Sequence, residues 1–236
     1  MTPKTAPKTA PGTAQPIERS VRAEMLHAAV ALLREHGPDE LQTRKVAAAA
    51  GTSTMAVYTH FGGMAGLITA VAEEGFAQFD TALSVHETSD PVADLLAIGV
   101  AYRRFAIQRP HVYRLMFGST SAHGINAPAG NVLTLPLTEI YNCIPSFAHL
   151  VRAVHRSMLA GRIGTDADAA ADNEVVAKAA QFWACIHGFV MLELAGFYGD
   201  DDSAAPPVLT AMTTNLLVAL GDSPDRVHRS WHSARG

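Results

Sequence analysis

The sequence contains few cysteines, few aromatic residues and few charges. Of its 236 residues, two are cysteine, 7% are aromatic and 17% are charged. Cys143 and Cys185 stand alone in apolar stretches, so neither a disulfide scaffold nor a cysteine metal site is expected. Both are predicted to be buried thiols in a reducing compartment. The net charge of −4 excludes a uniformly basic nucleic-acid coat but leaves room for a local basic patch.

Long hydrophobic runs, secretion signals and enzyme motifs are also missing. No apolar run approaches the roughly 20 residues that a membrane-spanning helix needs. The first 16 residues lack the apolar segment of a signal peptide. We therefore expect a cytoplasmic protein with no membrane partner. No GxSxG, GxxxxGK[ST], HExxH or GxGxxG pattern occurs, so no enzyme activity, no catalytic residue and no cofactor is predicted.

What is present is a core-forming composition with an uneven charge. Hydrophobic residues make up 48% of the chain, enough to bury a substantial core. Residues 1–65 carry seven lysines and arginines against five acids, whereas residues 66–236 carry 11 against 17. A mildly basic N-terminal part therefore precedes an acidic body, which indicates that the two parts do different jobs.

Apolar residues recur at spacings of three and four over most of the chain, and this predicts an all-α fold. Three short helices are expected over 18–65, a connecting helix over 66–87 and a helical bundle over 88–221. Further helices in the bundle are predicted over 90–109, 110–117, 132–162, 167–197 and 206–220. Pro136 and Pro145 should kink or split the helix that contains them. Residues 1–17 are predicted to be a flexible arm, 118–130 a loop and 222–236 a flexible tail.

The segment from Thr43 to Phe61 is typical of a helix-turn-helix. Ala47 is the small residue at the helix contact, and Gly51 ends the first helix because glycine adopts a positive φ without strain. Thr52 or Ser53 is expected to cap the second helix. The second helix then presents short, polar or flat side chains outward, as a helix in the DNA major groove requires.

The run from Val46 to Phe61, VAAAAGTSTMAVYTHF, resembles the DNA-binding signature of the tetracycline-repressor (TetR) family, IAxxAGVSxxxLYxHF. Motif similarity covers about residues 20–80. The segments 182–194, with its Trp-His-Gly pattern, and 102–117 resemble one group of TetR C-terminal domains. The resemblance implies a three-helix DNA-binding domain followed by a bundle that binds a small ligand and dimerises.

The candidate DNA contacts follow from chemistry and from this resemblance. Thr43 and Arg44 can hold phosphate at a helix N-terminus. Tyr58 and His60 match the family's paired phosphate contacts, although either could instead be an ordinary packed or surface residue, and Thr43 only a helix cap. The full set predicted to contact DNA is Thr43, Arg44, Lys45, Thr52, Ser53, Thr54, Met55, Ala56, Tyr58, Thr59 and His60.

Two departures from the family pattern stand out. Met64 occupies the position where the family usually has a lysine that contacts phosphate, and Gln42 stands where a Ser or Thr cap is expected. Losing one phosphate contact lowers the salt dependence by roughly 0.9 per charge. Met64 therefore motivates an alternative function, a helical ligand-binding or partner-binding protein whose DNA contacts have decayed.

The C-terminal part is expected to enclose an apolar ligand cavity. Residues predicted to line it are Phe105, Met116, Phe117, Phe147, Trp183, His187 and Met191, although any one of these residue types is more often ordinary core. Glu193 is expected to pair across a dimer interface or to face solvent. His228 and His232 are spaced like metal ligands but have no third partner nearby, so no metal site is predicted. The predicted function is a homodimeric repressor that binds a palindromic operator on double-stranded DNA and is released by an unknown small hydrophobic effector.

Overall fold

The computed structural model describes residues 20–117, 131–165, 171–199 and 201–234, and within these ranges the chain is helical and contains no strand. The predicted arm over 1–17 and loop over 118–130 lie outside them. The α-helices are α1 (Val21–His36), α2 (Thr43–Ala49), α3 (Thr54–Phe61), α4 (Met64–Leu83), α5 (Pro91–Gln108), α6 (Pro110–Phe117), α7 (Leu137–Cys143), α8 (Pro145–Leu159), α10 (Asp172–Leu194), α11 (Ala211–Ala219) and α12 (Pro224–Ala234). Shorter turns are η1 (Pro38–Glu40), η2 (Val132–Thr134) and the π-helical η3 (Ala205–Thr210).

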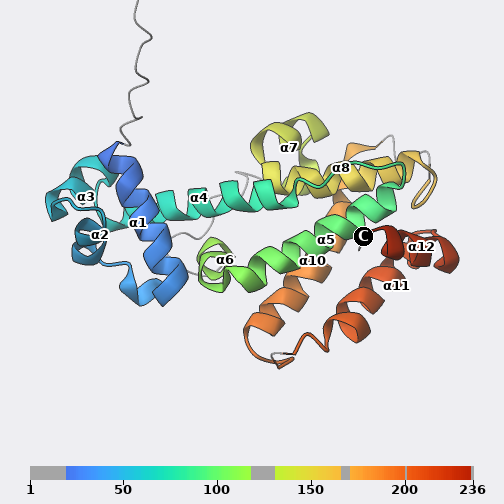
Figure 1. Cartoon of the computed structure of the whole chain (residues 1–236). Coiled ribbons are helices and arrows are strands. Elements are labelled where there is room, and N and C mark those ends of the chain that lie inside the picture. Colours follow the sequence, from blue (N-terminus) through green and yellow to red (C-terminus); the bar gives the residue numbers. More distant parts are fainter. Residues whose placement is uncertain (1–19, 118–130, 166–170, 200, 235–236) are drawn as a thin grey trace, which may run out of the picture.

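Helices α1, α2 and α3 form a small module at one end of the molecule (Figure 1). Met25 and Leu33 on α1 are fully buried, and so are Val46 on α2 and Val57 on α3. These side chains belong to one hydrophobic cluster, so the apolar stripe of α1 is covered by the two helices that follow. Ser20 begins α1 by accepting a hydrogen bond from the Ala23 amide at 3.3 Å.

Helix α4 runs from this module into the body of the protein (Figure 1). It ends at Leu83, a few residues before the predicted end of the connecting helix. Gly75 lies where α4 meets α6, and a Cβ atom placed there would stand 3.0 Å from both Val112 Cγ1 and Met116 Sδ. The missing side chain is what lets these two helices approach so closely.

The body is a bundle in which α5, α8 and α10 pack against one another. The predicted 132–162 helix is split at both prolines, as expected. Pro136 is the residue before α7, and Pro145 is the first residue of α8, where its missing N–H costs no intrahelical bond. The last predicted helix begins as the π-helical η3 before it continues as α11.

The prediction of a flexible tail over 222–236 is wrong. Residues 224–234 form α12, which packs mainly against α5. Val227 and Ser230 are buried, and Trp231 packs against the core. Val227 is the one aliphatic residue larger than alanine in 222–236, so the sequence predicted a solvent-exposed segment. It is ordered because that side chain, a serine and a tryptophan share one face of the helix.

The expectations for the two cysteines and for the length of the apolar segments also differ from the structure. Cys143 is exposed and Cys185 is half-buried, so neither is a buried thiol. Helix α10 has 23 residues and a mean hydropathy of 1.5 over 18 of them, which makes it long and apolar enough to cross a membrane by length and composition. Of that 18-residue window, 44% is buried inside the protein.

Candidate functional site

The turn between α2 and α3 is built by Gly51. It has a φ of 63°, and its N–H donates to the Ala48 carbonyl at 3.1 Å. The next N–H, of Thr52, donates to the Ala47 carbonyl at 2.9 Å. This pair of bonds satisfies the last carbonyls of α2 and turns the chain sharply into α3. The predicted role of Gly51 in the helix-turn-helix is thereby confirmed.

Helix α3 turns a hydrophilic but bulky face outward. Val57 is buried beneath it, whereas Met55 and Tyr58 are 68% and 60% exposed. Ser53, Thr54, Thr59 and His60 are also exposed, and Thr52 and Ala56 are half-buried. Ser53 stands at the N-cap position but makes no side-chain cap, so the first amides of α3 have no such acceptor. These amides and the exposed side chains together offer donors to phosphates and base edges.

Not all predicted DNA contacts are equally free in this structure. Lys45 Nζ lies 2.5 Å from a Glu40 carboxylate oxygen, and Thr59 Oγ1 donates to the Met55 carbonyl at 3.1 Å. Gln42 binds the Asp39 carbonyl through its side chain and does not cap α2. Arg44 is exposed and Thr43 half-buried at the start of α2. The basic charge that this helix presents to solvent is therefore chiefly that of Arg44.

A cavity of about 660 Å³ lies inside the body. Helices α4, α5, α6, α8, α10, α11 and α12 all contribute to its wall, together with η3. Most of the wall is aromatic or aliphatic, including Phe76 and Phe79 from α4 and Phe182 from α10. The volume falls within the range of small-molecule sites, which are mostly apolar and carry a few polar groups.

Two family models match the chain. Residues 25–71 match the model described as bacterial regulatory proteins of the tetR family, and residues 95–216 match the tetracyclin repressor-like C-terminal domain. The second match alone covers more than half of the chain. The protein belongs to the TetR family.

Relatives of this TetR-family protein point the same way. HTH-type transcriptional regulators of Mycobacterium bovis and Mycobacterium tuberculosis are 26% identical over 217 residues, which is 85% of this chain and 92% of theirs. A protein of unknown function from Rhodococcus sp. RHA1 has a TM-score of 0.63 and 26% identity, over 89% of this chain and 100% of that one. RolR, solved in complex with the ligand resorcinol, has a TM-score of 0.59 and 16% identity, over 91% and 92% of the two chains. The chain is a TetR-family transcriptional regulator, as its sequence predicted.

The structure places four of the seven predicted ligand residues on the cavity wall, namely Met116, Phe117, Phe147 and Trp183. The other three lie off it. Phe105 is buried beside Phe79, with ring centroids 5.0 Å apart. His187 stands behind Tyr102, and Met191 follows one turn later on α10. The aromatic pair on α4, Phe76 and Phe79, was missed, although its spacing of three residues on one helix face is visible in the sequence.

Arg103 is the one charged residue among the described residues of the cavity wall, and acidic side chains already neutralise its charge. The guanidinium binds both carboxylate oxygens of Glu193, with Nε donating to Oε2 at 2.9 Å, and it also contacts Asp202. The hydrogen bonds that Arg103 donates to Glu193 raise the pKa of Arg103. Glu193 is only 8% exposed and pairs with Arg103 of its own chain, so the expectation that it faces solvent is wrong. A neutral occupant thus suits the cavity better than an anion.

A chain of polar groups leads from Trp183 and Tyr102 on the cavity wall to Tyr113 and His187 behind it. The Trp183 indole donates to the Tyr102 hydroxyl at 3.3 Å, the hydroxyls of Tyr102 and Tyr113 are 2.8 Å apart, and Tyr113 lies 2.8 Å from His187 Nδ1. These bonds are compatible when Tyr102 donates to Tyr113 and Tyr113 donates to Nδ1 of a neutral His187. Burial lowers the pKa of His187, and it raises the pKa of Tyr102 to about 12.

Stability should depend on pH through His187. Because burial lowers its pKa in the folded state, the unfolded chain takes up the proton first as the pH falls. The stability that neutral His187 contributes is therefore fully present above about pH 6.5. It is lost gradually as the pH falls from there to the pKa of His187 in the folded state. In urea unfolding at pH 7.5, 6.5 and 5.5, wild type should lose more stability than His187→Gln. The control is His27→Gln at an exposed position, whose free energy of unfolding should depend on pH as that of wild type does. If the free energies of wild type and His187→Gln fall equally with pH, this role of His187 is contradicted.

Proposed function

We propose that this protein is a cytoplasmic, homodimeric repressor that binds a palindromic operator and is released by a small, neutral, hydrophobic effector. The observation that carries the proposal is that the same two helices line the cavity and support the DNA-binding module. Phe76 and Phe79 on α4, and Met116 and Phe117 on α6, belong to the cavity wall. Both helices also contact α1, at the back of the module.

The contact between α6 and α1 is close enough to transmit small displacements. A Cβ atom on Gly37, at the end of α1, would lie 3.3 Å from the His111 ring of α6. On the other side of α6, Gly75 holds α4 in direct contact with Val112 and Met116. An effector that changes the spacing of α4 and α6 therefore moves α1, and with it α2 and α3. The change in DNA affinity cannot exceed the difference in effector affinity between the two arrangements.

Dimerisation is supported by the composition of α11. Leu217 is the one residue of this helix that is buried within the protomer, and Met212 and Ala219 are exposed on its outer face together with Asn215. A large apolar side chain such as Met212, 42% exposed here, is the kind of residue that an interface covers. Beside it, α10 exposes Ala184, Gly188 and Leu192 at spacings of four residues. A second copy packed on these two helices would cover both faces and bring two α3 helices to two half-sites.

The proposal is tested by selecting duplexes from a randomised pool and by titrating DNA from upstream of the gene across a salt series. Enrichment of a palindrome with half-sites about one helical turn apart supports the dimeric regulator. Absence of binding at low salt, in protein shown by mass spectrometry to be ligand-free, would favour the alternative of decayed DNA contacts. Release of the selected duplex is then measured with small neutral aromatic compounds, starting with resorcinol because RolR was solved with it.

Substituting Met64 with lysine should strengthen binding at low salt. Met64 is the first residue of α4 and half-buried, so a lysine there can lay its stem along the core and extend its charge to phosphate. Each dimer gains two charges, which steepens the salt slope by about 1.8 and adds about a tenfold gain between 200 and 50 mM salt. The control is Leu159→Lys on α8. Equal slopes for Met64→Lys and wild type would show that this position does not face DNA.

A further inference from the structure

Helix α12 lies beyond residue 216, where the match to the C-terminal family model ends, yet it forms part of the body. It packs against α5 and α11 at the end of the molecule opposite the DNA-binding module (Figure 1). Its inward residues are spaced by three and four, whereas its charged residues and histidines are exposed. The inward set is Val227, Ser230, Trp231 and Ala234, and the exposed set is Arg226, His228, Arg229 and His232.

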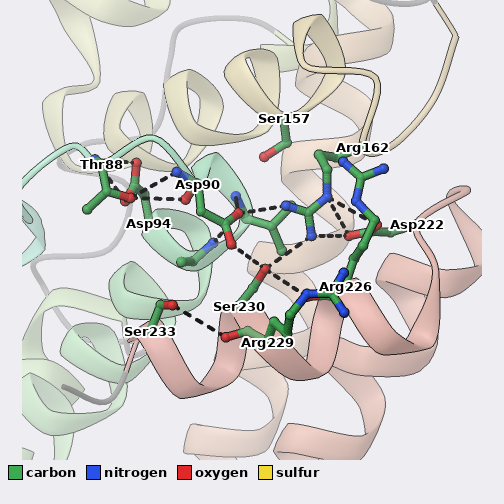
Figure 2. Close-up of polar contacts among 12 residues, drawn as sticks. Thr88, Asp90, Asp94, Ser157, Arg162, Asp222, Arg226, Arg229, Ser230 and Ser233 are labelled. Carbon is green, nitrogen blue, oxygen red and sulfur yellow. Dashed lines mark hydrogen bonds and ion pairs between the residues drawn. The ribbon is translucent and has the colours of Figure 1, made fainter.

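A buried polar network holds α12 in place, and Figure 2 shows it centred on Arg162. The guanidinium donates to Asp222 Oδ2 from Nη2 at 2.7 Å and to Asp90 Oδ1 from Nη1 at 2.7 Å. Ser230 accepts from the same guanidinium at 3.1 Å and donates to Asp90 Oδ2 at 2.6 Å. Asp90 is also the N-cap of α5. The network thus ties α12 to the first turn of α5.

Trp231 follows directly after this anchor, and its side chain is part of the cavity wall. The indole N–H donates to Thr214 Oγ1 on α11 at 3.0 Å, which fixes the orientation of the ring. Tyr102, at the polar part of the wall, comes twelve residues after Asp90 on α5, or about 18 Å along the helix. Trp231, next to the residue that binds Asp90, and Tyr102 therefore bound the cavity at different levels along α5.

We propose that Trp231 is a specificity-determining residue of the effector cavity, whose indole forms the wall at the α12 end and limits the length of the molecule that fits. This inference rests on the proposed effector cavity. Thr214 orients the indole, and the Arg162 network keeps α12 against α5. An extended molecule that reaches from Tyr102 towards α12 meets the indole, whereas a compact one does not.

The test compares two neutral fluorescent probes in the full-length protein. N-phenyl-1-naphthylamine is compact and 1,6-diphenyl-1,3,5-hexatriene is an extended rod, and both become fluorescent in apolar surroundings. Trp231→Ala should improve the affinity for the rod relative to the compact probe by about tenfold, the size of effect that small volume changes have in apolar pockets. Trp231→Phe should shift the ratio less, in the same direction. Tyr141→Ala, which removes a half-buried ring outside the cavity wall, is the control and should leave it unchanged.

The outcomes separate this inference from the proposed function. If wild type binds both probes but neither Trp231 variant changes their ratio, the end-wall role is overturned and the effector cavity stands. If wild type binds neither probe at saturation, both are overturned. Ser230→Ala tests the anchor, because it removes bonds to Asp90 and Arg162 while retaining Trp231. Release of N-phenyl-1-naphthylamine in stopped flow should accelerate about fivefold in this variant, the net effect expected when these bonds are lost, and an unchanged rate would contradict the anchoring.

Discussion

Replacing Arg162 with methionine should lower the free energy of unfolding by about 3–5 kcal/mol, the largest stability loss we expect for a single substitution in this protein. Arg162 is buried, and the side chain of its partner Asp222 is 0% exposed. Methionine fills a similar volume but leaves the Asp222 carboxylate without its main counter-charge. The melting temperature of a chain of this size should fall by about 6–20 °C, measured by circular dichroism.

The matched control is Arg229→Met, the same change at an exposed position on α12, which should alter stability by no more than about 0.5 kcal/mol. A pH series adds a second check. Burial raises the pKa of Asp90, but hydrogen bonds from Ser230 and the Ala93 amide, together with Arg162, hold it below its ordinary value. Its contribution is therefore present above about pH 4 and lost as the pH falls through the folded pKa. The difference in the free energy of unfolding between wild type and Arg162→Met should therefore become smaller below about pH 4. A small difference at pH 7 would contradict the role of the network.

The DNA-binding module could be predicted from the sequence because its constraints are local. The turn at Gly51 needs a residue that accepts a positive φ, and the contact between the helices needs a small residue such as Ala47. Both requirements appear as residue types at fixed spacing, so the pattern identified the family and the outward face of α3. The pattern could not show which of the predicted DNA-contacting side chains are paired with other side chains in the folded protein. Lys45 is paired with Glu40 because two helices bring them together, and no spacing rule predicts that contact.

The cavity was predictable in kind but not in detail. Aromatic residues on several helices indicated an apolar site, yet which of them face the cavity depends on how the helices are rotated. Phe105 faces the core and Phe79 faces the cavity, although the two rings touch. The contribution of α12 was not predicted at all. Its position depends on Arg162, which binds both Asp90 and Asp222. These partners are 72 and 60 residues away from Arg162 in the sequence, and such distant pairings leave no local signal in one sequence.

Placing a glutamate at Met55 should reduce operator affinity at least about 100-fold while leaving the fold intact. Met55 is exposed in the first turn of α3, the face proposed to meet DNA. A carboxylate there opposes the phosphates of each half-site, and juxtaposed like charges cost several kcal/mol, where every 1.4 kcal/mol is tenfold in affinity. Stability should change little, because the site is exposed and an acidic residue near a helix N-terminus is favourable.

The control for this substitution is Leu159→Glu, which adds the same charge at a side chain that is 66% exposed on α8, in the C-terminal body. Affinity for the selected duplex is measured for both variants at several salt concentrations, with unfolding curves alongside. Met55→Leu should bind nearly as well as wild type, because it retains an apolar side chain of similar size. If Met55→Glu binds within about threefold of wild type, the outward face of α3 is not the surface that meets the phosphates. A loss shared equally by Leu159→Glu would instead assign the effect to net charge, since that residue lies away from α3.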